Sequence, residues 1–133
     1  MDRSILLVGL GGFIGSILRH LIGSFISRII PLSFPFATLS INVIGCLVIG
    51  ALYGAYQKHG AFTEAWWLFL AVGVCGGFTT FSAFSLEGLT LLQNTKFLPF
   101  FAYLSLSIIL CFAAIWAGMS LFNNLFQHFH MEG

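Results

Sequence analysis

Residues 65–86, AWWLFLAVGVCGGFTTFSAFSL, decide the fold, because this apolar run contains no charged residue. A helix that crosses a bilayer needs about 20 predominantly apolar residues, and the run is long enough. Within it, a Gly-Gly pair at 76–77 is followed by two threonines and a serine at 79–82. Adjacent glycines weaken a helix, and hydroxyl side chains compete with its backbone hydrogen bonds. We therefore predict a membrane-spanning helix that is interrupted near its middle, with residues 76–80 non-helical.

The whole chain has the composition of a membrane protein. Its 133 residues are 59% hydrophobic and 7% charged, whereas soluble domains are typically about 25% charged. Further apolar runs lie on both sides of the first, and the predicted spans cover about residues 4–25, 36–56, 65–92 and 100–122, followed by a short tail. The sequence predicts an all-α integral membrane protein, with four transmembrane helices in one domain over residues 1–133 and a broken third helix.

Small residues recur four positions apart in all four predicted spans, a spacing that lets helix backbones approach closely in lipid. The pairs are Gly11/Gly15, Gly50/Gly54, Gly73/Gly77 and Ala114/Gly118.

The basic residues are almost evenly divided between the two sides of the membrane. Arg3 and Lys58 belong to one side, whereas Arg28 and Lys96 belong to the other, with Arg19 nearer that second side. Since Lys and Arg normally collect on the cytoplasmic side, this balance indicates a chain that inserts in both orientations and pairs antiparallel. The alternative is a single orientation set by a weaker cue. The net charge of +1 gives no indication of a nucleic-acid partner.

No constellation typical of an enzyme is visible, so we do not expect catalysis. Cys46, Cys75 and Cys111 each lie alone in an apolar run, without the spacing of a metal site or a disulfide framework. We interpret them as small packing residues.

Several polar residues lie inside the spans, where they are costly and usually have a function. Arg19 either extends to the headgroups or attracts anions toward a vestibule. Asn42, one turn after Thr38, either joins two helices by a hydrogen bond or offers its N–H donors to a ligand. In the fourth span, Tyr103 and Ser107 are also one turn apart and, with Asn42, form a ladder of weak donors suited to ion conduction.

An aromatic stripe accompanies these donors. Phe78, Phe81 and Phe84 recur every three residues, so we expect them on roughly one face of the third helix. Such a stripe usually packs, but the electropositive ring edges also suit contact with an anion.

Three segments together carry a family resemblance: GGFIGSILRH at 11–20, ATLSINVIGCLVIG at 37–50 and GVCGGFTTFSAFSLE at 73–87. In sequence, order and four-span length, the chain resembles the Fluc/CrcB family of fluoride channels. The resemblance implies an antiparallel, dual-topology homodimer in a bacterial inner membrane, with two pores through which cytoplasmic fluoride leaves passively, which protects the cell from fluoride toxicity.

The resemblance also implies roles for particular residues. A structural sodium ion at the dimer interface would bind the main-chain carbonyls of Gly76 and Thr79. Arg19 matches the arginine that ends the first motif, the role of Glu87 stays open, and Cys111 stands where a hydroxyl is expected to extend the polar track. The implied pore residues are Asn42, Phe81, Phe84, Tyr103 and Ser107.

Two other functions remain possible on the residues alone. A small dual-topology multidrug or cation exporter has the same size, but it needs a membrane-embedded carboxylate, usually in the first span, where this chain has Arg19. An accessory membrane subunit explains the packing glycines, but not the predicted break, Asn42 and the aromatic stripe together.

Overall fold

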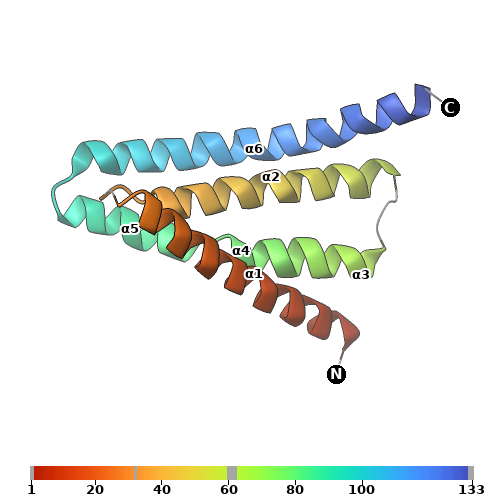
Figure 1. The fold of residues 1–133 in the computed structure, drawn as a ribbon, viewed down its shortest axis with the longest axis horizontal. Helices are drawn as coiled ribbons and strands as arrows, with labels where there is room; N and C mark the ends of the chain where they lie inside the picture. Colours follow the sequence, from red (N-terminus) through yellow and green to blue (C-terminus); the bar gives the residue numbers. More distant parts are fainter. Residues whose placement is uncertain (1, 32, 60–62, 132–133) are drawn as a thin grey trace.

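The regular secondary structure is entirely helical wherever the structure is described. The computed structural model describes residues 2–31, 33–59 and 63–131, and these ranges contain helices and short loops but no strand (Figure 1). In chain order the elements are α1 (Arg3–Ile29), α2 (Phe36–His59), α3 (Glu64–Trp67), the π-helix η1 (Leu68–Cys75), α4 (Gly76–Phe78), α5 (Phe81–Gln93) and α6 (Phe97–Met131).

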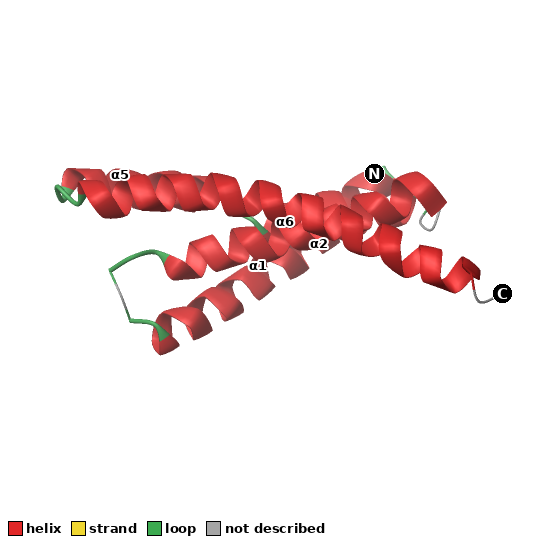
Figure 2. Cartoon of the chain, turned by 90° about the horizontal axis from the view of Figure 1, so that it is seen from above, coloured by secondary structure: helices red, strands yellow, loops and turns green. Residues whose placement is uncertain are grey.

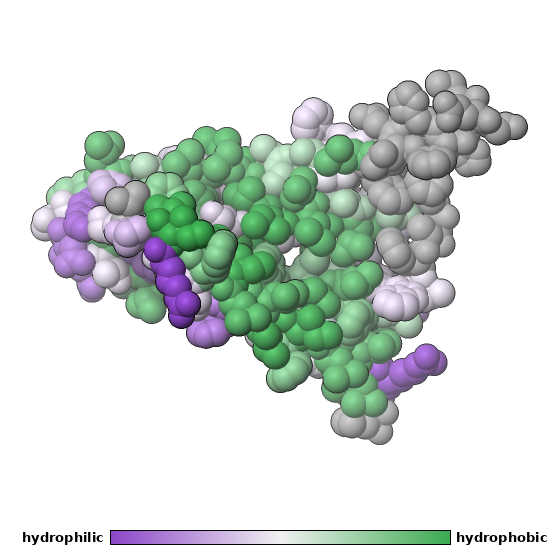
Figure 3. Space-filling view, viewed as in Figure 1, coloured by the Kyte–Doolittle hydropathy of each residue, from purple (hydrophilic) through white to green (hydrophobic). Residues whose placement is uncertain are grey.

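The helices provide the four membrane crossings that the sequence predicts. Within the described residues, four helical stretches are long and apolar enough to span a bilayer: Arg3–Ile29, Phe36–Gln57, Glu64–Gln93 and Phe97–Leu121. Both termini lie at the same end of the bundle in Figure 1, as an even number of crossings requires. Hydrophilic side chains gather at the ends of the molecule in Figure 3, with an apolar surface between them. The chain is therefore a multi-pass membrane protein.

Two helices extend further than we expected. α1 continues to Ile29, so that Arg28 lies in its last turn. α6 runs to Met131, and the tail expected after about residue 122 is helical as far as the structure describes it.

The first helix and the first half of the third span form one tightly packed pair, with α1 running at an angle to α5 and α6 (Figure 2). A Cβ atom added to Gly11 would lie 2.9 Å from the Cα of Gly73, and one added to Gly77 would lie 2.9 Å from the Cα of Gly12. The glycines therefore permit direct backbone contact between α1 and the η1–α4 segment, as their spacing predicts.

The second pair consists of α2 and α6, which run in the same direction along the bundle. Its closest approach is also made by glycines, because a Cβ atom on Gly50 would lie 2.9 Å from the Cα of Ile115. One added to Gly118 would lie 2.8 Å from the amide nitrogen of Ala51. At the other end of this pair, α5 packs on α6 around a small core of Leu39, Leu91 and Tyr103.

The interruption of the third span is narrower than the predicted 76–80. Gly76–Phe78 forms the helical turn α4, and only Thr79 and Thr80 leave the helix. The expectation that Gly76 is non-helical was wrong, since its φ and ψ of −63° and −39° are those of an α-helix. The glycine pair does not break the helix here, because Gly77 instead provides the contact with Gly12 on α1. The threonines make the break.

Candidate functional site

Thr79 ends the first half of the third span by bonding back to the preceding turn. Its amide and its hydroxyl both donate to the carbonyl oxygen of Cys75, at 3.0 and 2.9 Å. With this carbonyl doubly occupied, Thr79 adopts extended backbone angles, φ −77° and ψ 157°. The competition between a threonine hydroxyl and the helical ladder, predicted from the sequence, is therefore present at the first residue of the break.

Thr80 begins the second half as the N-cap of α5. Its φ of −149° and ψ of 117° are extended, and its hydroxyl accepts a 3.1 Å hydrogen bond from the amide of Ala83. The same hydroxyl lies 3.2 Å from the Oγ of Ser82. A side-chain oxygen that accepts from the third helical amide is the standard N-cap arrangement, so the sequence both ends one helix and starts the next within two residues.

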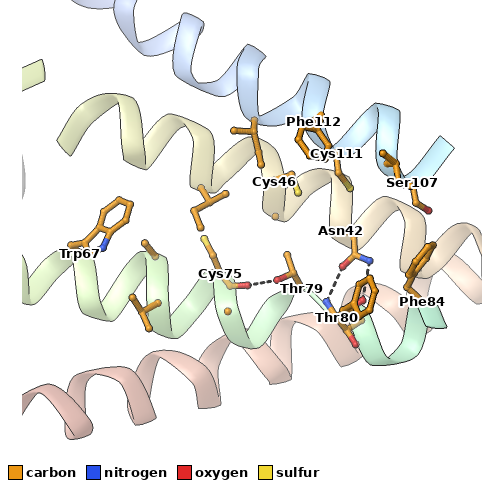
Figure 4. A pocket seen from close by; sticks show the side chains of 18 residues that line it. Asn42, Cys46, Trp67, Cys75, Thr79, Thr80, Phe84, Ser107, Cys111 and Phe112 are labelled. Carbon is orange, nitrogen blue, oxygen red and sulfur yellow. Dashed lines mark hydrogen bonds between the residues drawn. The ribbon is translucent and has the colours of Figure 1, made fainter. Parts of the chain in front are cut away.

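Asn42 on α2 binds the backbone of the break through two hydrogen bonds. Its Nδ2 donates to the carbonyl oxygen of Thr80 at 3.0 Å, and its Oδ1 accepts from the Thr80 amide at 2.8 Å (Figure 4). A primary amide matches a peptide group in this way because it carries one acceptor beside two N–H donors. The sequence left two roles open for Asn42, an interhelical hydrogen bond or a donor to a ligand. The interhelical hydrogen bond is present, and it uses only one of the two N–H groups of Nδ2.

These bonds leave two carbonyl groups without their helical donors. In a continuous α-helix the Gly76 carbonyl would accept from Thr80 N–H, but that amide donates to Asn42. The Thr79 carbonyl would accept from Ala83 N–H, but that amide donates to the Thr80 hydroxyl. The two carbonyls that the family resemblance singles out are thus among the four, at 76–79, whose helical donors the break removes. Gly76 is exposed, and a Cβ atom added to it would meet no atom within 4 Å.

The break opens onto a cavity of about 570 Å³ between α2, α6 and the third span (Figure 4). Asn42, Phe81, Phe84 and Ser107 line it, together with Gly76 and Thr79. Most of its wall is apolar, with a few polar groups among hydrophobic side chains, which is the usual character of a small-ligand site.

Ser107 carries the most unusual polar group in the cavity wall. The residue is 7% exposed, and its Oγ has no hydrogen-bond partner among the described residues. Serine hydroxyls in helices commonly bond to the carbonyl one turn back, as Ser120 does to Trp116 at 2.9 Å. A buried polar group without a partner costs about 1–3 kcal/mol, so the Ser107 hydroxyl is a donor available to a ligand.

The aromatic stripe is divided by the break, so the expectation of one continuous face was wrong. Phe78 lies before the break and is buried. Its ring packs against Gly45 on α2, where an added Cβ atom would lie 3.2 Å from the ring. Phe81 and Phe84 lie after the break in α5, with ring centroids 5.5 Å apart at an interplanar angle of 44°. Phe81 is 78% exposed. Of the three phenylalanines in the stripe, Phe81 and Phe84 line the cavity and Phe78 does not.

Tyr103 lies away from this cavity and forms a separate polar cluster. Its hydroxyl donates to Oε2 of Glu87 at 2.7 Å, while the Thr38 hydroxyl donates to Oε1 at 2.7 Å. Tyr103 is 1% exposed and borders a smaller cavity of about 190 Å³, which Phe84 also lines. Phe84 thus separates the Tyr103–Glu87 cluster from the cavity of Asn42 and Ser107.

Glu87 is the functional candidate whose partners the sequence did not reveal. A carboxylate inside a span was a signal in itself, but its two hydroxyl donors come from α2 and α6 and become neighbours only in the folded bundle. Arg19 lies half-buried on α1 and lines neither cavity.

Comparisons with known proteins place most of the chain in one family. Residues 6–119 match the family model described as CrcB-like protein, Camphor Resistance (CrcB). A protein of Flavobacterium psychrophilum is 42% identical over 123 residues, which cover 92% of this chain and 99% of the relative. A Campylobacter lari protein is 40% identical, over 92% of this chain and all of the relative, and a Hyphomonas neptunium protein is 45% identical, over 91% and 96%. Each of these three relatives is named a fluoride-specific ion channel FluC.

Proposed function

This chain belongs to the CrcB-like family, and from that membership we propose that it is a fluoride-specific ion channel. It lets fluoride leave the cytoplasm passively, down its gradient, and so protects the cell from fluoride toxicity. It lies in the bacterial inner membrane as a multi-pass protein, consistent with its four apolar spans. A channel of this kind moves an ion without chemical conversion, so it is not an enzyme.

The Ser107 hydroxyl is the single observation that supports an anion path most directly. A buried donor in a cavity wall, without a partner in the described part of the chain, is what a small hydrogen-bond acceptor requires. Fluoride is small and strongly hydrated, so a narrow path must replace its water with donors that are favourable but weak enough to release it. The remaining N–H of Asn42 supplies a second donor in the same cavity.

The phenylalanine pair that follows the break fits the same path. Phe81 and Phe84 border the cavity that contains Ser107 and Asn42. The edge of an aromatic ring is electropositive, so it contributes a weak contact with an anion while it excludes bulk water. Tyr103 borders the neighbouring cavity beyond Phe84, where its hydroxyl already donates to Glu87 and so offers no donor to the anion. Arg19 adds a positive field at the vestibule.

The proposal includes an antiparallel, dual-topology homodimer around a structural sodium ion. The Gly76 and Thr79 carbonyl oxygens fit such an ion as ligands, because hard cations prefer oxygen. Both carbonyls have also lost the amide that would bond to them in a continuous helix. Gly76 also faces open space, as an interface residue would. When bound, sodium would supply positive charge that satisfies these carbonyls and joins two chains. The even distribution of basic residues supports insertion in both orientations.

A multidrug exporter is the less favoured alternative. It requires a carboxylate that is free to exchange protons for a cationic substrate, whereas both oxygens of Glu87 accept bonds from Thr38 and Tyr103. The names of the relatives also favour the channel.

The channel is tested by ion efflux from liposomes that contain the purified protein. Vesicles loaded with potassium fluoride should release fluoride rapidly once valinomycin provides a path for potassium, and vesicles loaded with potassium chloride should retain chloride. Protein-free vesicles give the background rate. Fluoride release no faster than this background would refute the channel, and equal release of chloride would refute its selectivity.

Dual topology is tested by labelling a single cysteine at position 96, in a chain whose native cysteines are replaced by alanine. A membrane-impermeant thiol reagent applied to sealed vesicles should label about half of the chains, since the α5–α6 turn would lie on each side equally. Labelling of all or none of the chains would contradict dual topology without contradicting the channel.

A further inference from the structure

The two helices α2 and α6 bring together two cysteines that the sequence presents as isolated. Cys46 on α2 and Cys111 on α6 lie at the same level of the contact between these two helices. Both are free and half-buried, and both line the cavity of about 570 Å³. Figure 4 shows them on neighbouring helices, beside Asn42 and Ser107.

This pairing follows from the parallel register of α2 and α6. One turn before the cysteines lie Asn42 and Ser107, and one turn after them lie Gly50 and Ile115. A Cβ atom on Gly50 would lie 2.9 Å from the Cα of Ile115, so the two backbones nearly touch there. Because the helices run in the same direction at this close approach, residues one turn earlier on each helix also face one another. The thiols are thus held together by the fold.

We propose that Cys46 and Cys111 form a two-thiol binding site for a soft metal cation of the Hg²⁺, Ag⁺ or Cu⁺ class. Thiolates are the protein ligands that such ions prefer, and two of them from facing helices suit ions that bind two sulfurs. For Hg²⁺, two S–H bonds break, two S–Hg bonds form and two protons are released, with no change of oxidation state. Cys75 lines the same cavity from η1, but it is buried and is not part of the pair.

A bound cation would lie beside the proposed anion path. The thiols adjoin Ser107 and Asn42 in one cavity, so a metal ion between them would tie α2 to α6 and occupy the space next to the donors. The two thiolates cancel the charge of Hg²⁺, so the bound ion would act by filling the path and by fixing the two helices to each other. We therefore expect soft metal ions to inhibit fluoride efflux. Metal binding itself is independent of the proposed channel function, and only the inhibition rests on it.

Binding is tested directly, with Hg²⁺ as the probe and the purified full-length chain. Titration should end at one Hg²⁺ per chain, with the ultraviolet absorption of mercury–thiolate bonds and the loss of two reagent-accessible thiols. Cys46→Ala or Cys111→Ala should weaken binding roughly a hundredfold or more, since losing one of two linked ligands removes the gain from effective concentration. Cys75→Ala is the matched control and should bind as the unmodified chain does. Gel filtration establishes that each variant is folded.

Inhibition is tested in the same proteoliposomes. Hg²⁺ should block fluoride efflux by the unmodified chain and by Cys75→Ala, but not by Cys46→Ala, and dithiothreitol should reverse the block. Independent binding of one Hg²⁺ per thiol, or equal losses for all three variants, would overturn the paired site. A paired site that binds Hg²⁺ without blocking efflux would overturn the inhibition alone. If no variant conducts fluoride, the proposed function fails, while the titration still decides the site.

Discussion

Asn42 holds both backbone polar groups of Thr80, accepting from its amide at 2.8 Å and donating to its carbonyl at 3.0 Å. One side chain on α2 thus replaces the helical hydrogen bond that the Thr80 amide loses at the break, and it adds a bond to the carbonyl that also begins α5. A backbone amide inside the membrane needs such a partner, because each unsatisfied group there costs several kcal/mol.

Asn42→Ala should therefore destabilise the break as well as reduce fluoride efflux. It leaves the Thr80 amide without a partner, at about 1–3 kcal/mol for that group, and it removes the second bond to the Thr80 carbonyl. Amide hydrogen exchange at Thr80 should accelerate, and the thermal unfolding temperature in detergent should fall. Asn42→Asp keeps an oxygen that accepts from the Thr80 amide, so its unfolding temperature should fall less than that of Asn42→Ala. Asn94→Ala, in the exposed α5–α6 turn, is the control. If hydrogen exchange at the Thr80 amide is unchanged in Asn42→Ala, Asn42 does not stabilise the backbone at the break.

Gly76→Ala distinguishes contacts within one chain from contacts beyond it. The added methyl group meets no atom within 4 Å, and alanine favours a helix over glycine by about 1 kcal/mol. The single chain should therefore tolerate the change, while a sodium-bridged dimer should not. We expect a smaller dimer fraction by light scattering and lower fluoride efflux. Gly9→Ala, which also meets no atom within 4 Å, is the control. Equal behaviour of the two variants would argue against an interface at Gly76.

Ser107→Ala should reduce fluoride conduction without loss of stability. The Ser107 hydroxyl has no partner among the residues that the structure describes, so its removal costs no hydrogen bond to any of them. A hydrogen bond to an ion contributes about 1.5–3 kcal/mol, which corresponds to a loss of roughly 10- to 100-fold in affinity. Efflux measurements and thermal unfolding of the same preparation check both parts. Ser105→Ala, exposed on the same helix, should leave both unchanged. If Ser107→Ala is less stable but conducts fluoride normally, the Ser107 hydroxyl has a structural role and does not bind the ion.

Glu87→Gln should disturb the cluster with Thr38 and Tyr103. The carboxylate accepts from both hydroxyls, whereas a glutamine amide has only one oxygen and so leaves one donor unmatched. We expect a loss of stability of about 1–3 kcal/mol for that buried group. The double variant Thr38→Val/Glu87→Gln removes the unmatched donor and should recover part of the loss. Glu64→Gln, on an exposed residue, is the control. No recovery in the double variant would show that the pair is not coupled.

The sequence by itself determined the membrane class, the number of spans and the presence of an interruption in the third. These features follow from composition and local chemistry, since apolar length sets a span and glycine spacing permits close backbones. The family segments also made the function accessible from the sequence, because 11–20, 37–50 and 73–87 are contiguous in it.

The tertiary structure alone decided which residues meet. Gly76 is helical and Thr79–Thr80 are not, because Gly77 is needed against Gly12 and Asn42 captures the Thr80 amide. Sequence spacing describes one helix at a time. Four successive crossings already require α2 and α6 to run in the same direction, but only the fold places them side by side in the register that brings Cys46 next to Cys111. Packing between helices is set by backbone approach at a few glycines, a property of the folded bundle.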